Sequence, residues 1–495
     1  MSKQSAAMPF TTLSLDTSSP VPLYRQLYEG LRHAILSGQL RPSARLQSTR
    51  ELAAELGVSR NTVMNAFEQL LAEGYLEGQV GSGTYVSRAL PDDMLQAGAV
   101  SVRAGRARRK GRALSDRGLV IANTMVNASP APSSTRAFRP GTPALDRFPF
   151  DVWMKLTARH WRYPRRDLLG YGDSAGYGPL REAISEYLGA ARAVLCDPEQ
   201  VIITSGAQQA LDLAARLLLD AGDSVWIEDP GFLGARSSLV GAGARLVPVP
   251  VDEEGLDVAR GATLCPSARL VYISPSHHFP LGVTMSLARR LSLLEWASRA
   301  GAWILEDDYD SEYRYAGRPL AALQGLDKEG RVIYLGTFSK ILFPSLRLGY
   351  MVVPFDLVDA FKNARAILSR FSPSIEQAVL TDFMMEGHFA RHIRRMRELY
   401  RERQECLIEA ARRELGGALE LEPDEAGMHL VGRLPSGADD RAVSRKANKL
   451  GVEASPLSLY FIERARTSGL ILGYAGYDER EIRKGVRLLA AALDI

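Results

Sequence analysis

The sequence predicts a multidomain chain, in which a small helical domain with a β-hairpin precedes a larger α/β domain with a mostly parallel central sheet. Its 495 residues exceed what one hydrophobic core usually organises. Helical periodicity dominates the N-terminal part, and after residue 138 short strand-like apolar runs alternate with helical patterns. The expected boundaries are 13–88 for the first domain, 89–137 for a flexible basic linker and 138–495 for the second domain, with a smaller C-terminal subdomain at about 386–495.

The composition is that of a soluble globular protein. Apolar residues make up 46% of the chain and charged residues 24%, and no apolar run is long enough to span a membrane. Residues 1–12 lack the basic start and apolar core of a secretory signal, so we expect a cytoplasmic protein. Cys196, Cys265 and Cys406 lie far apart, a spacing that predicts neither a disulfide framework nor a metal site.

Positive charge gathers at the N-terminal end. Residues 1–117 carry 15 Lys or Arg against 10 Asp or Glu, whereas the rest of the chain is nearly balanced. This excess indicates that a polyanion would bind the N-terminal quarter. Part of the excess lies between residues 103 and 112 of the linker, which is either a solvated tether or a source of salt-sensitive phosphate contacts.

Three helices are predicted in the first domain. Residues 22–36 place leucine and isoleucine at helical spacing. Ser48 and Glu51 form a capping box before a second, short helix that stops at a glycine. Ser59 then caps a third helix at 60–73, which has a polar first turn. This order is typical of a helix-turn-helix whose last helix enters the major groove of DNA.

Residues 75–86 predict two short strands around a glycine turn, which completes a winged helix-turn-helix. The segments STRELAAELGVSRNTV and LLAEGYLEGQVGSGTYV resemble the GntR family of bacterial regulators. The resemblance implies binding to double-stranded DNA, rather than protein contacts alone, through Arg45, Arg50, Arg60, Asn61, Thr62 and Gly83. Gln47 and Met64 depart from the family's usual residues, so it implies no operator sequence.

The second domain alternates apolar strand-like runs with helical patterns, which predicts a mostly parallel sheet with helices on both faces. The strand-like runs are 201–204, 224–227, 270–273, 302–305 and 332–335. Ligands of such open sheets bind beyond the carboxyl ends of the strands. The residues that follow these runs are therefore the candidates for a binding site.

Four of these strand ends carry complementary chemistry. After the first run, the turn at 205–208 leads into a helix, where free backbone N–H groups suit a phosphate. Phe232 follows the second run and offers a face for stacking on a planar ring. The fourth run leads into Asp307, and a carboxylate can hold a pyridinium N–H. After the fifth run, Lys340 offers an amine for a Schiff base.

With the segments YGDSAGYGPLREAI, SGAQQAL, EDPGF and EDDYDSEYRY, these residues resemble the fold-type I aminotransferases, and the whole chain resembles the MocR subfamily of GntR regulators. The resemblance implies pyridoxal 5'-phosphate (PLP) as cofactor. Lys340 would be the Schiff-base lysine and Asp307 the partner of the pyridine nitrogen, with Asp308 as the alternative. Tyr309 would bond the ring hydroxyl and Phe232 would stack on the ring. The phosphate would be held by Gly206, Ala207, Gln208, Thr337, Ser339 and Arg347, with Tyr171 reaching over from the partner subunit.

Two segments depart from the aminotransferase pattern. Where those enzymes carry an asparagine against the ring, this chain reads SPSHHFPLG, and His277 or Ser276 takes the asparagine's place. Residues 469–474 lack the arginine that clamps a substrate carboxylate, although Arg464 or Arg466 could compensate. Without the clamp, we expect the domain to sense a ligand rather than to catalyse a committed transamination.

The main functional hypothesis is a transcription regulator in which PLP, or an amino compound that reacts at Lys340, modulates operator binding. Genes of vitamin B6 or amino-compound metabolism are the expected targets. The alternatives are an active aminotransferase that carries a DNA-binding domain, and an architectural DNA-binding protein with an inert cofactor domain. A head-to-tail homodimer is expected, because fold-type I sites form across a two-fold interface and helix-turn-helix dimers read two half-sites.

Overall fold

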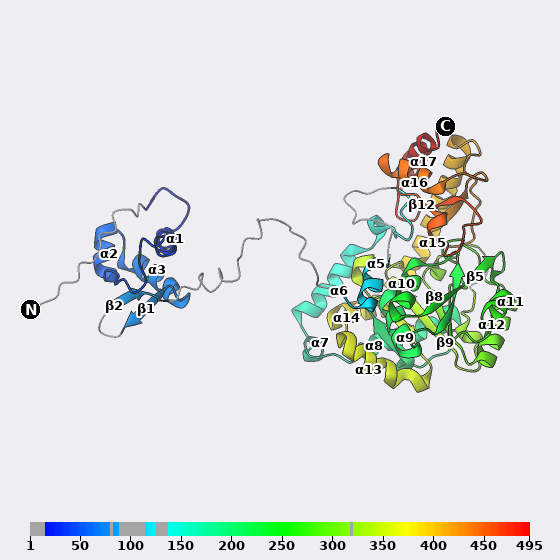
Figure 1. The fold of residues 1–495 in the computed structure, drawn as a ribbon, viewed down its shortest axis with the longest axis horizontal. Helices are drawn as coiled ribbons and strands as arrows, with labels where there is room; N and C mark the ends of the chain where they lie inside the picture. Colours follow the sequence, from blue (N-terminus) through cyan, green and yellow to red (C-terminus); the bar gives the residue numbers. More distant parts are fainter. Residues whose placement is uncertain (1–14, 80–82, 89–113, 125–136, 317–319) are drawn as a thin grey trace, which may run out of the picture. The chain divides into compact units, whose positions relative to one another are not determined.

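The computed structural model describes residues 15–79, 83–88, 114–124, 137–316 and 320–495. It contains two compact units, Met1–Ala113 and Leu114–Ile495 (Figure 1). The wing turn at 80–82 and the basic stretch at 103–112 lie outside the described residues.

The N-terminal unit is a winged helix-turn-helix, as predicted. Its helices are α1 (Leu23–Leu36), α2 (Thr49–Leu56) and α3 (Arg60–Ala72), and its wing consists of β1 (Leu76–Gln79) and β2 (Gly83–Val86). The two strands pair antiparallel, with Leu76 opposite Val86. One apolar core joins all of these elements, and it includes Leu27, Leu31, Leu52, Val63, Phe67, Leu70 and Val86.

The helix starts follow the predicted capping residues. The Ser48 hydroxyl accepts a hydrogen bond from the Glu51 N–H at 3.3 Å, and the Glu51 carboxylate accepts one from the Ser48 N–H at 3.0 Å. Ser59 caps α3 by accepting from the Thr62 N–H at 3.2 Å. Gly57 ends α2 with a φ of 65°, in the left-handed region that glycine adopts without strain. The sequence therefore determines this motif locally.

Removal of the first cap gives a measurable prediction. We expect Ser48→Ala to destabilise the N-terminal unit by about 1 kcal/mol, because the Glu51 N–H loses its acceptor. Hydrogen exchange of the α2 amides in the full chain measures this loss. Glu55→Ala, at an exposed position of the same helix, is the control and should leave the exchange nearly unchanged. Equal exchange in both variants would contradict the capping role.

The larger unit is built on an eight-stranded sheet. Its strands are β3 (Val201–Thr204), β4 (Ser224–Asp229), β5 (Arg245–Asp252), β6 (Gly255–Leu256), β7 (Leu270–Ile273), β8 (Trp303–Asp308), β9 (Val332–Thr337) and β10 (Gly349–Val352). Their order is β3-β10-β9-β8-β7-β4-β5-β6. The central pairs from β5 to β9 are parallel, while β10 is antiparallel to both of its neighbours and β6 to β5. The predicted, mostly parallel sheet is confirmed.

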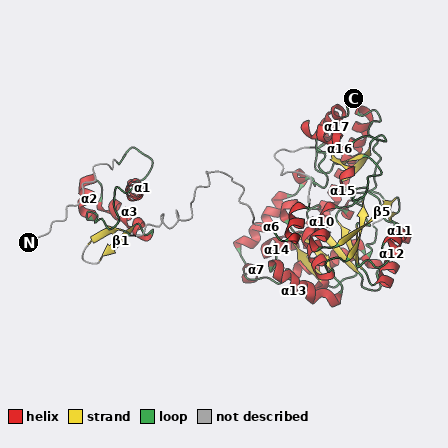
Figure 2. Cartoon of the chain, in the orientation of Figure 1, coloured by secondary structure: helices red, strands yellow, loops and turns green. Residues whose placement is uncertain are grey.

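Helices cover both faces of this sheet (Figure 2). They are α6 (Phe150–Arg162), α7 (Arg166–Leu169), α8 (Gly178–Arg192), α9 (Ala207–Leu218), α10 (Leu233–Ala242), α11 (Val258–Leu264), α12 (Leu287–Ala300), α13 (Val358–Ser369) and α14 (Ser374–Met385). Successive strand residues feed separate cores, since side chains alternate between the faces of a strand. On β4, Ile227 packs in the core beneath α9 and α10, and Trp226 packs in the core beneath α12.

The C-terminal part has a core and a three-stranded sheet of its own. It comprises α15 (His388–Glu414), β11 (His429–Arg433), α16 (Asp440–Lys449), β12 (Ser455–Pro456), β13 (Gly469–Gly473) and α17 (Glu479–Ala492). The strand order is β11-β13-β12. Phe138, from the start of the second predicted domain, bridges to Gly473 and is fully buried in this core. The segment that follows the predicted linker therefore packs on the C-terminal subdomain.

A further helix, α5 (Asp116–Asn123), forms within the stretch predicted as linker. It lies against α10 of the larger unit (Figure 1). Within the described part of the chain, no helix is long and apolar enough to cross a membrane. Cys196, Cys265 and Cys406 are all free thiols.

Candidate cofactor and DNA-binding sites

Lys340 lies just beyond the end of β9, with its amine in a buried position. Its Nζ donates a hydrogen bond to the Gly141 carbonyl at 2.9 Å. A Cβ at Gly141 would lie only 2.6 Å from this Nζ, so a side chain at this position would displace the amine. Burial lowers the pKa of Lys340 from its usual value, against the opposing charges of Asp310 and Asp307. A lysine in this setting is more readily neutral, and therefore more nucleophilic, than an exposed one.

Asp307 and Asp308 are neighbours on β8 and lie in different surroundings. The Tyr272 hydroxyl donates to Asp307 Oδ2 at 2.7 Å, while the buried Oδ1 of Asp307 has no hydrogen-bond partner among the described residues. Burial raises the pKa of Asp307 to about 6, although the Tyr272 hydrogen bond and the Lys340 charge favour the carboxylate. Asp308 Oδ2 accepts from Arg192 Nε at 2.8 Å and from the Tyr334 hydroxyl at 2.6 Å. Asp308 Oδ1, like Asp307 Oδ1, has no hydrogen-bond partner among the described residues, so the two acids differ in the arginine and tyrosine that engage Asp308.

The Arg192–Asp308 pair is buried, so breaking it should be costly. The exposed fractions of the two side chains are 5% and 1%. We expect Arg192→Leu to lower the free energy of unfolding by about 3–5 kcal/mol, because an uncompensated carboxylate remains in the interior. Arg216→Leu, which breaks an exposed pair with Asp212 at the same 2.8 Å, should cost about 1 kcal/mol or less. Chemical denaturation of both variants measures the difference, and similar losses would contradict the assigned burial cost.

Tyr309 and His277 meet in a buried polar cluster. The Tyr309 hydroxyl lies 3.0 Å from His277 Nδ1, which is also 3.0 Å from Asp310 Oδ2. His277 Nε2 lies 3.4 Å from Asp424 Oδ2, a residue of the C-terminal part. Burial alone would lower the pKa of His277, but Asp310 and Asp424 raise it to about 10. The imidazole is therefore cationic at neutral pH. Ser276 instead accepts a hydrogen bond from Arg192 Nη2 at 2.7 Å.

The turn predicted to bind phosphate lies at the start of α9. Gly206 is the N-cap with a φ of 112°, and it provides no side-chain cap for the helix. A Cβ at Gly206 would lie 3.6 Å from Nη1 of Arg347, which places this exposed guanidinium beside the helix N-terminus. The Gln208 amide donates to the Gly234 carbonyl at 3.0 Å and to the Ser238 hydroxyl at 2.7 Å. At the end of β9, Thr337 Oγ1 accepts from the Ser339 N–H at 3.2 Å.

The two predicted aromatic residues have different positions. Phe232 is the N-cap of α10, and its half-buried ring lies edge-on to Phe279 with the ring centres 6.1 Å apart. Tyr171 is 86% exposed and contacts the ring of Phe371 and the guanidinium of Arg370. No described contact joins Tyr171 to the lysine or to the turn at the start of α9 within this chain.

The strand predicted to lack an arginine is wholly apolar in its interior. Leu470, Ile471 and Leu472 of β13 are each fully buried. Ile471 packs with Leu233 at the first turn of α10 and with Tyr460. Arg464 and Arg466, in the preceding loop, are both exposed.

Several residues of this site escaped the sequence analysis. Gly141 supplies the carbonyl that holds Lys340, Tyr272 positions Asp307, and Asp424 holds His277. Asp310 had a signal, because it continues the run EDDYD beside two candidates. The other three come from distant segments whose approach depends on the tertiary fold.

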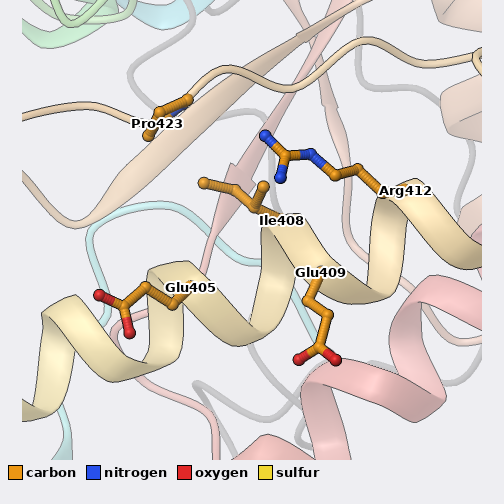
Figure 3. Close-up of a pocket in the computed structure, with 5 residues that line it drawn as sticks. All are labelled: Glu405, Ile408, Glu409, Arg412 and Pro423. Atoms are coloured by element: carbon orange, nitrogen blue, oxygen red, sulfur yellow. The ribbon is translucent and has the colours of Figure 1, made fainter.

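A surface pocket of about 320 Å³ lies elsewhere, on α15. Glu405, Ile408, Glu409 and Arg412 line it from one side of the helix, and Pro423 from the adjoining loop (Figure 3). It includes none of the predicted cofactor residues. We therefore assign it no part in the cofactor site.

In the N-terminal unit, the predicted DNA-contacting residues are accessible. Arg45, Arg50, Arg60 and Asn61 are exposed, and Thr62 is half-buried. The Arg60 Nε lies 3.4 Å from Thr49 Oγ1, so this guanidinium reaches from α3 to the start of α2. A Cβ at Gly83 would lie 3.1 Å from Arg45 Nε, which places Arg45 over the first residue of the second wing strand. The predicted DNA-contacting residues thus include Arg60 at the α2–α3 helix pair and Arg45 at the wing.

Comparison with known proteins agrees with both units. Residues 23–86 match the family of bacterial regulatory proteins, gntR family, and residues 141–487 match aminotransferase class I and II. The chain is 47% identical to the probable rhizopine catabolism regulatory protein MocR of Rhizobium meliloti, over 97% of this chain and 95% of that protein. It is 30% identical to the pyridoxine biosynthesis transcriptional regulator PdxR of Corynebacterium glutamicum, over 95% and 96% of the two chains.

Among solved structures, the α-aminoadipate aminotransferase LysN of Thermus thermophilus, complexed with N-(5'-phosphopyridoxyl)-L-leucine, matches with a TM-score of 0.67 and 30% identity. The match covers 78% of this chain and 96% of that chain. The fold and the site thus define a DNA-binding transcription regulator with an aminotransferase-like, PLP-dependent domain. The chain belongs to the MocR-type regulators of the GntR family.

The residues present fit pyridoxal phosphate. Asp307 Oδ1 is a buried acceptor without a donor, as a carboxylate that awaits a pyridinium N–H would be. The N-terminus of α9 lacks a side-chain cap and has Arg347 beside it, as a phosphate site requires. Lys340 offers a buried amine whose charge is stabilised by Asp310 and Asp307. The pyridine nitrogen, the phosphate and the aldehyde of the cofactor thus each have a suitable partner, in Asp307, in the start of α9 with Arg347, and in Lys340.

Proposed function

We propose that the occupancy of the site at Lys340 sets the affinity of the winged helix-turn-helix for operator DNA. The observation that carries this proposal is the coexistence of an intact cofactor-binding set with an apolar β13. Bound pyridoxal phosphate supplies an aldehyde that combines reversibly with primary amines. A domain that binds such a cofactor without a carboxylate clamp is suited to detecting a ligand rather than to turning it over.

Each predicted cofactor residue has a role in this proposal. Lys340 provides the amine that captures the aldehyde, and Asp307 keeps a proton on the ring nitrogen. The engagement of Asp308 with Arg192 and Tyr334 supports Asp307 over Asp308 for that role. Tyr309 would donate to the ring hydroxyl of the cofactor, and the His277 imidazolium holds Tyr309 in place. Contact with Tyr309 likewise supports His277 over Ser276 as the replacement for the asparagine.

The phosphate is held by backbone and side-chain donors. The N–H groups of Ala207 and Gln208 open α9, and Arg347 supplies a bidentate cation. Gly206 allows close approach because it has no side chain, and the hydroxyls of Thr337 and Ser339 complete the cradle. Phe232 would stack on one face of the ring. These residues orient the cofactor toward Lys340.

We also propose the effector class. PLP itself, or an amino compound that exchanges with Lys340 for the aldehyde, would be the ligand that changes DNA binding. The named relatives control different pathways, rhizopine catabolism and pyridoxine biosynthesis. The names of these relatives are compatible with the proposal that this chain regulates genes of vitamin B6 or amino-compound metabolism.

A head-to-tail homodimer completes the proposal. Large apolar side chains are exposed on α6, on α7 and beside them, and both helices pack on α14. The exposed residues are Phe150, Met154, Trp161, Tyr163, Leu169 and Tyr171. Apolar side chains that are exposed together on neighbouring helices are typical of a protein–protein interface. In the dimer, Tyr171 would reach the phosphate of the partner subunit. Sedimentation analysis should give twice the chain mass of 54.3 kDa.

The test combines absorption with DNA binding. Purified full-length protein should acquire the visible absorption of lysine-bound pyridoxal when PLP is added. Its affinity for the DNA upstream of its own gene, measured by fluorescence anisotropy, should then change. Absence of the absorption would refute the cofactor role, whereas absorption without any change in affinity would refute the regulatory one. Rapid turnover of an amino donor would favour the aminotransferase hypothesis.

A further inference from the structure

Helix α5 caps the C-terminal end of α10. The last carbonyls of any helix lack partners within it. At the end of α10, the Val240 and Leu239 carbonyls accept from the N–H groups of Gly243 and Ala244. The Gly241 carbonyl instead accepts from Arg117 Nε of α5 at 3.1 Å. A cation at this end also complements the helix dipole.

An apolar contact accompanies this cap. A Cβ at Gly241 would lie 3.6 Å from Ile121 Cγ1, so Ile121 lies directly over the glycine. The α5 helix is nevertheless held lightly, since none of its residues is buried and Ile121 is 51% exposed. A helix with no buried residue belongs to the parts of a fold that open most easily. Small changes in α10 can therefore shift its population.

The opposite end of α10 belongs to the cofactor site. Phe232 is the N-cap of α10, and Gln208 binds the Gly234 carbonyl and the Ser238 hydroxyl in its first two turns. The Phe232 ring fits only because Gly234 has no side chain; a Cβ there would lie 2.4 Å from Phe232 Cζ. Two residues that contact the cofactor in the proposed function thus fix the start of α10.

The helix between these ends is a stiff connector. It has 10 residues, so it spans about 15 Å. Six of these residues are buried. Buried helices transmit displacements because closely packed interiors deform little. The chain that leaves α5 in the N-terminal direction leads to the DNA-binding unit.

We infer that the docking of α5 on α10, through Arg117 and Ile121, is the connection by which cofactor binding reaches the tether of the DNA-binding unit. Cofactor binding fixes the positions of Phe232 and Gln208, and these residues in turn fix the position of α10. The C-terminal end of α10 then binds α5. Without cofactor, α5 is released more often. Arg117 is a positioning residue, because it acts through α10 and touches no ligand. This inference rests on the proposed function.

Hydrogen exchange in the full-length protein tests the connection without any DNA. PLP should slow exchange of the amides at 116–123 at least threefold in the wild type. In Arg117→Ala and Ile121→Ala, PLP should still produce its visible absorption, while its effect on these amides disappears. Arg260→Ala removes the same charge from an exposed position of α11 and should behave as the wild type.

DNA anisotropy provides the second measurement. The ratio of the affinities with and without PLP should approach one in Arg117→Ala and keep the wild-type value in Arg260→Ala. An unchanged ratio in Arg117→Ala, or PLP-independent exchange of α5 in the wild type, overturns the inference while the absorption still supports the cofactor site. Loss of the absorption in the wild type would refute the proposed function, and this inference with it.

Discussion

Replacement of Lys340 by alanine should abolish the visible absorption that PLP gives with the wild-type protein. The amine of Lys340 is the group that would bind the aldehyde, since the charged residues that act on it, Asp310, Asp307 and Arg139, offer no primary amine. The variant should remain folded, because the substitution removes a buried amine that burial already destabilises in its charged form. Any PLP-dependent change in DNA affinity should disappear with the absorption.

A control and a pH series sharpen this result. Lys328→Ala, at an exposed position, should keep both the absorption and the DNA response. Burial lowers the pKa of Lys340, so its neutral fraction at a given pH exceeds that of an exposed lysine. Cofactor capture should therefore accelerate as pH rises, with a midpoint below the usual lysine pKa. Retention of the absorption in Lys340→Ala would assign the Schiff base to another lysine.

Much of the fold was accessible from sequence because its signals are local. Each of the five strand-like runs corresponds to a strand, and the runs predicted at 302–305 and 332–335 form the strands Trp303–Asp308 and Val332–Thr337. The acids of β8 are paired within the sheet, with Asp307 opposite Leu335 of β9. They therefore belong to the strand rather than to the loop that their polarity suggests. The antiparallel β10 was not foreseen, because a four-residue run carries no sign of strand direction.

The residues of the candidate site likewise fall into two groups, those with a local sequence signal and those that the tertiary fold brings to the site. Residues next to a strand end in sequence, such as Lys340 and Phe232, were predicted because strand ends converge in open sheets. Gly141 and Asp424 reach Lys340 and His277 only through the packing of segments 199 and 147 residues away in the chain. Helix α5 was missed because its eight residues bury nothing, so no apolar periodicity distinguishes it from a tether.

Loss of Arg50 and Arg60 together should remove most of the DNA affinity. Arg60 opens α3, the second helix of the helix-turn-helix, and Arg50 lies in the first turn of α2. Both guanidiniums are exposed, as phosphate or base-edge contacts require. Each loss should weaken binding about tenfold, and the double variant Arg50→Ala/Arg60→Ala about a hundredfold.

The salt dependence of binding distinguishes direct contacts from a general loss of charge. Each arginine that neutralises a phosphate releases counterions, so its removal should lower the slope of log affinity against log salt by about one. Arg25→Ala removes another exposed charge from α1, where Arg25 pairs with Glu29 of the same helix, and should leave the slope unchanged. If Arg25→Ala lowered the slope as much as Arg60→Ala, affinity would follow the overall positive charge of the domain. Equal slopes in the wild type and Arg60→Ala, with affinity still lost, would instead assign Arg60 to a base edge.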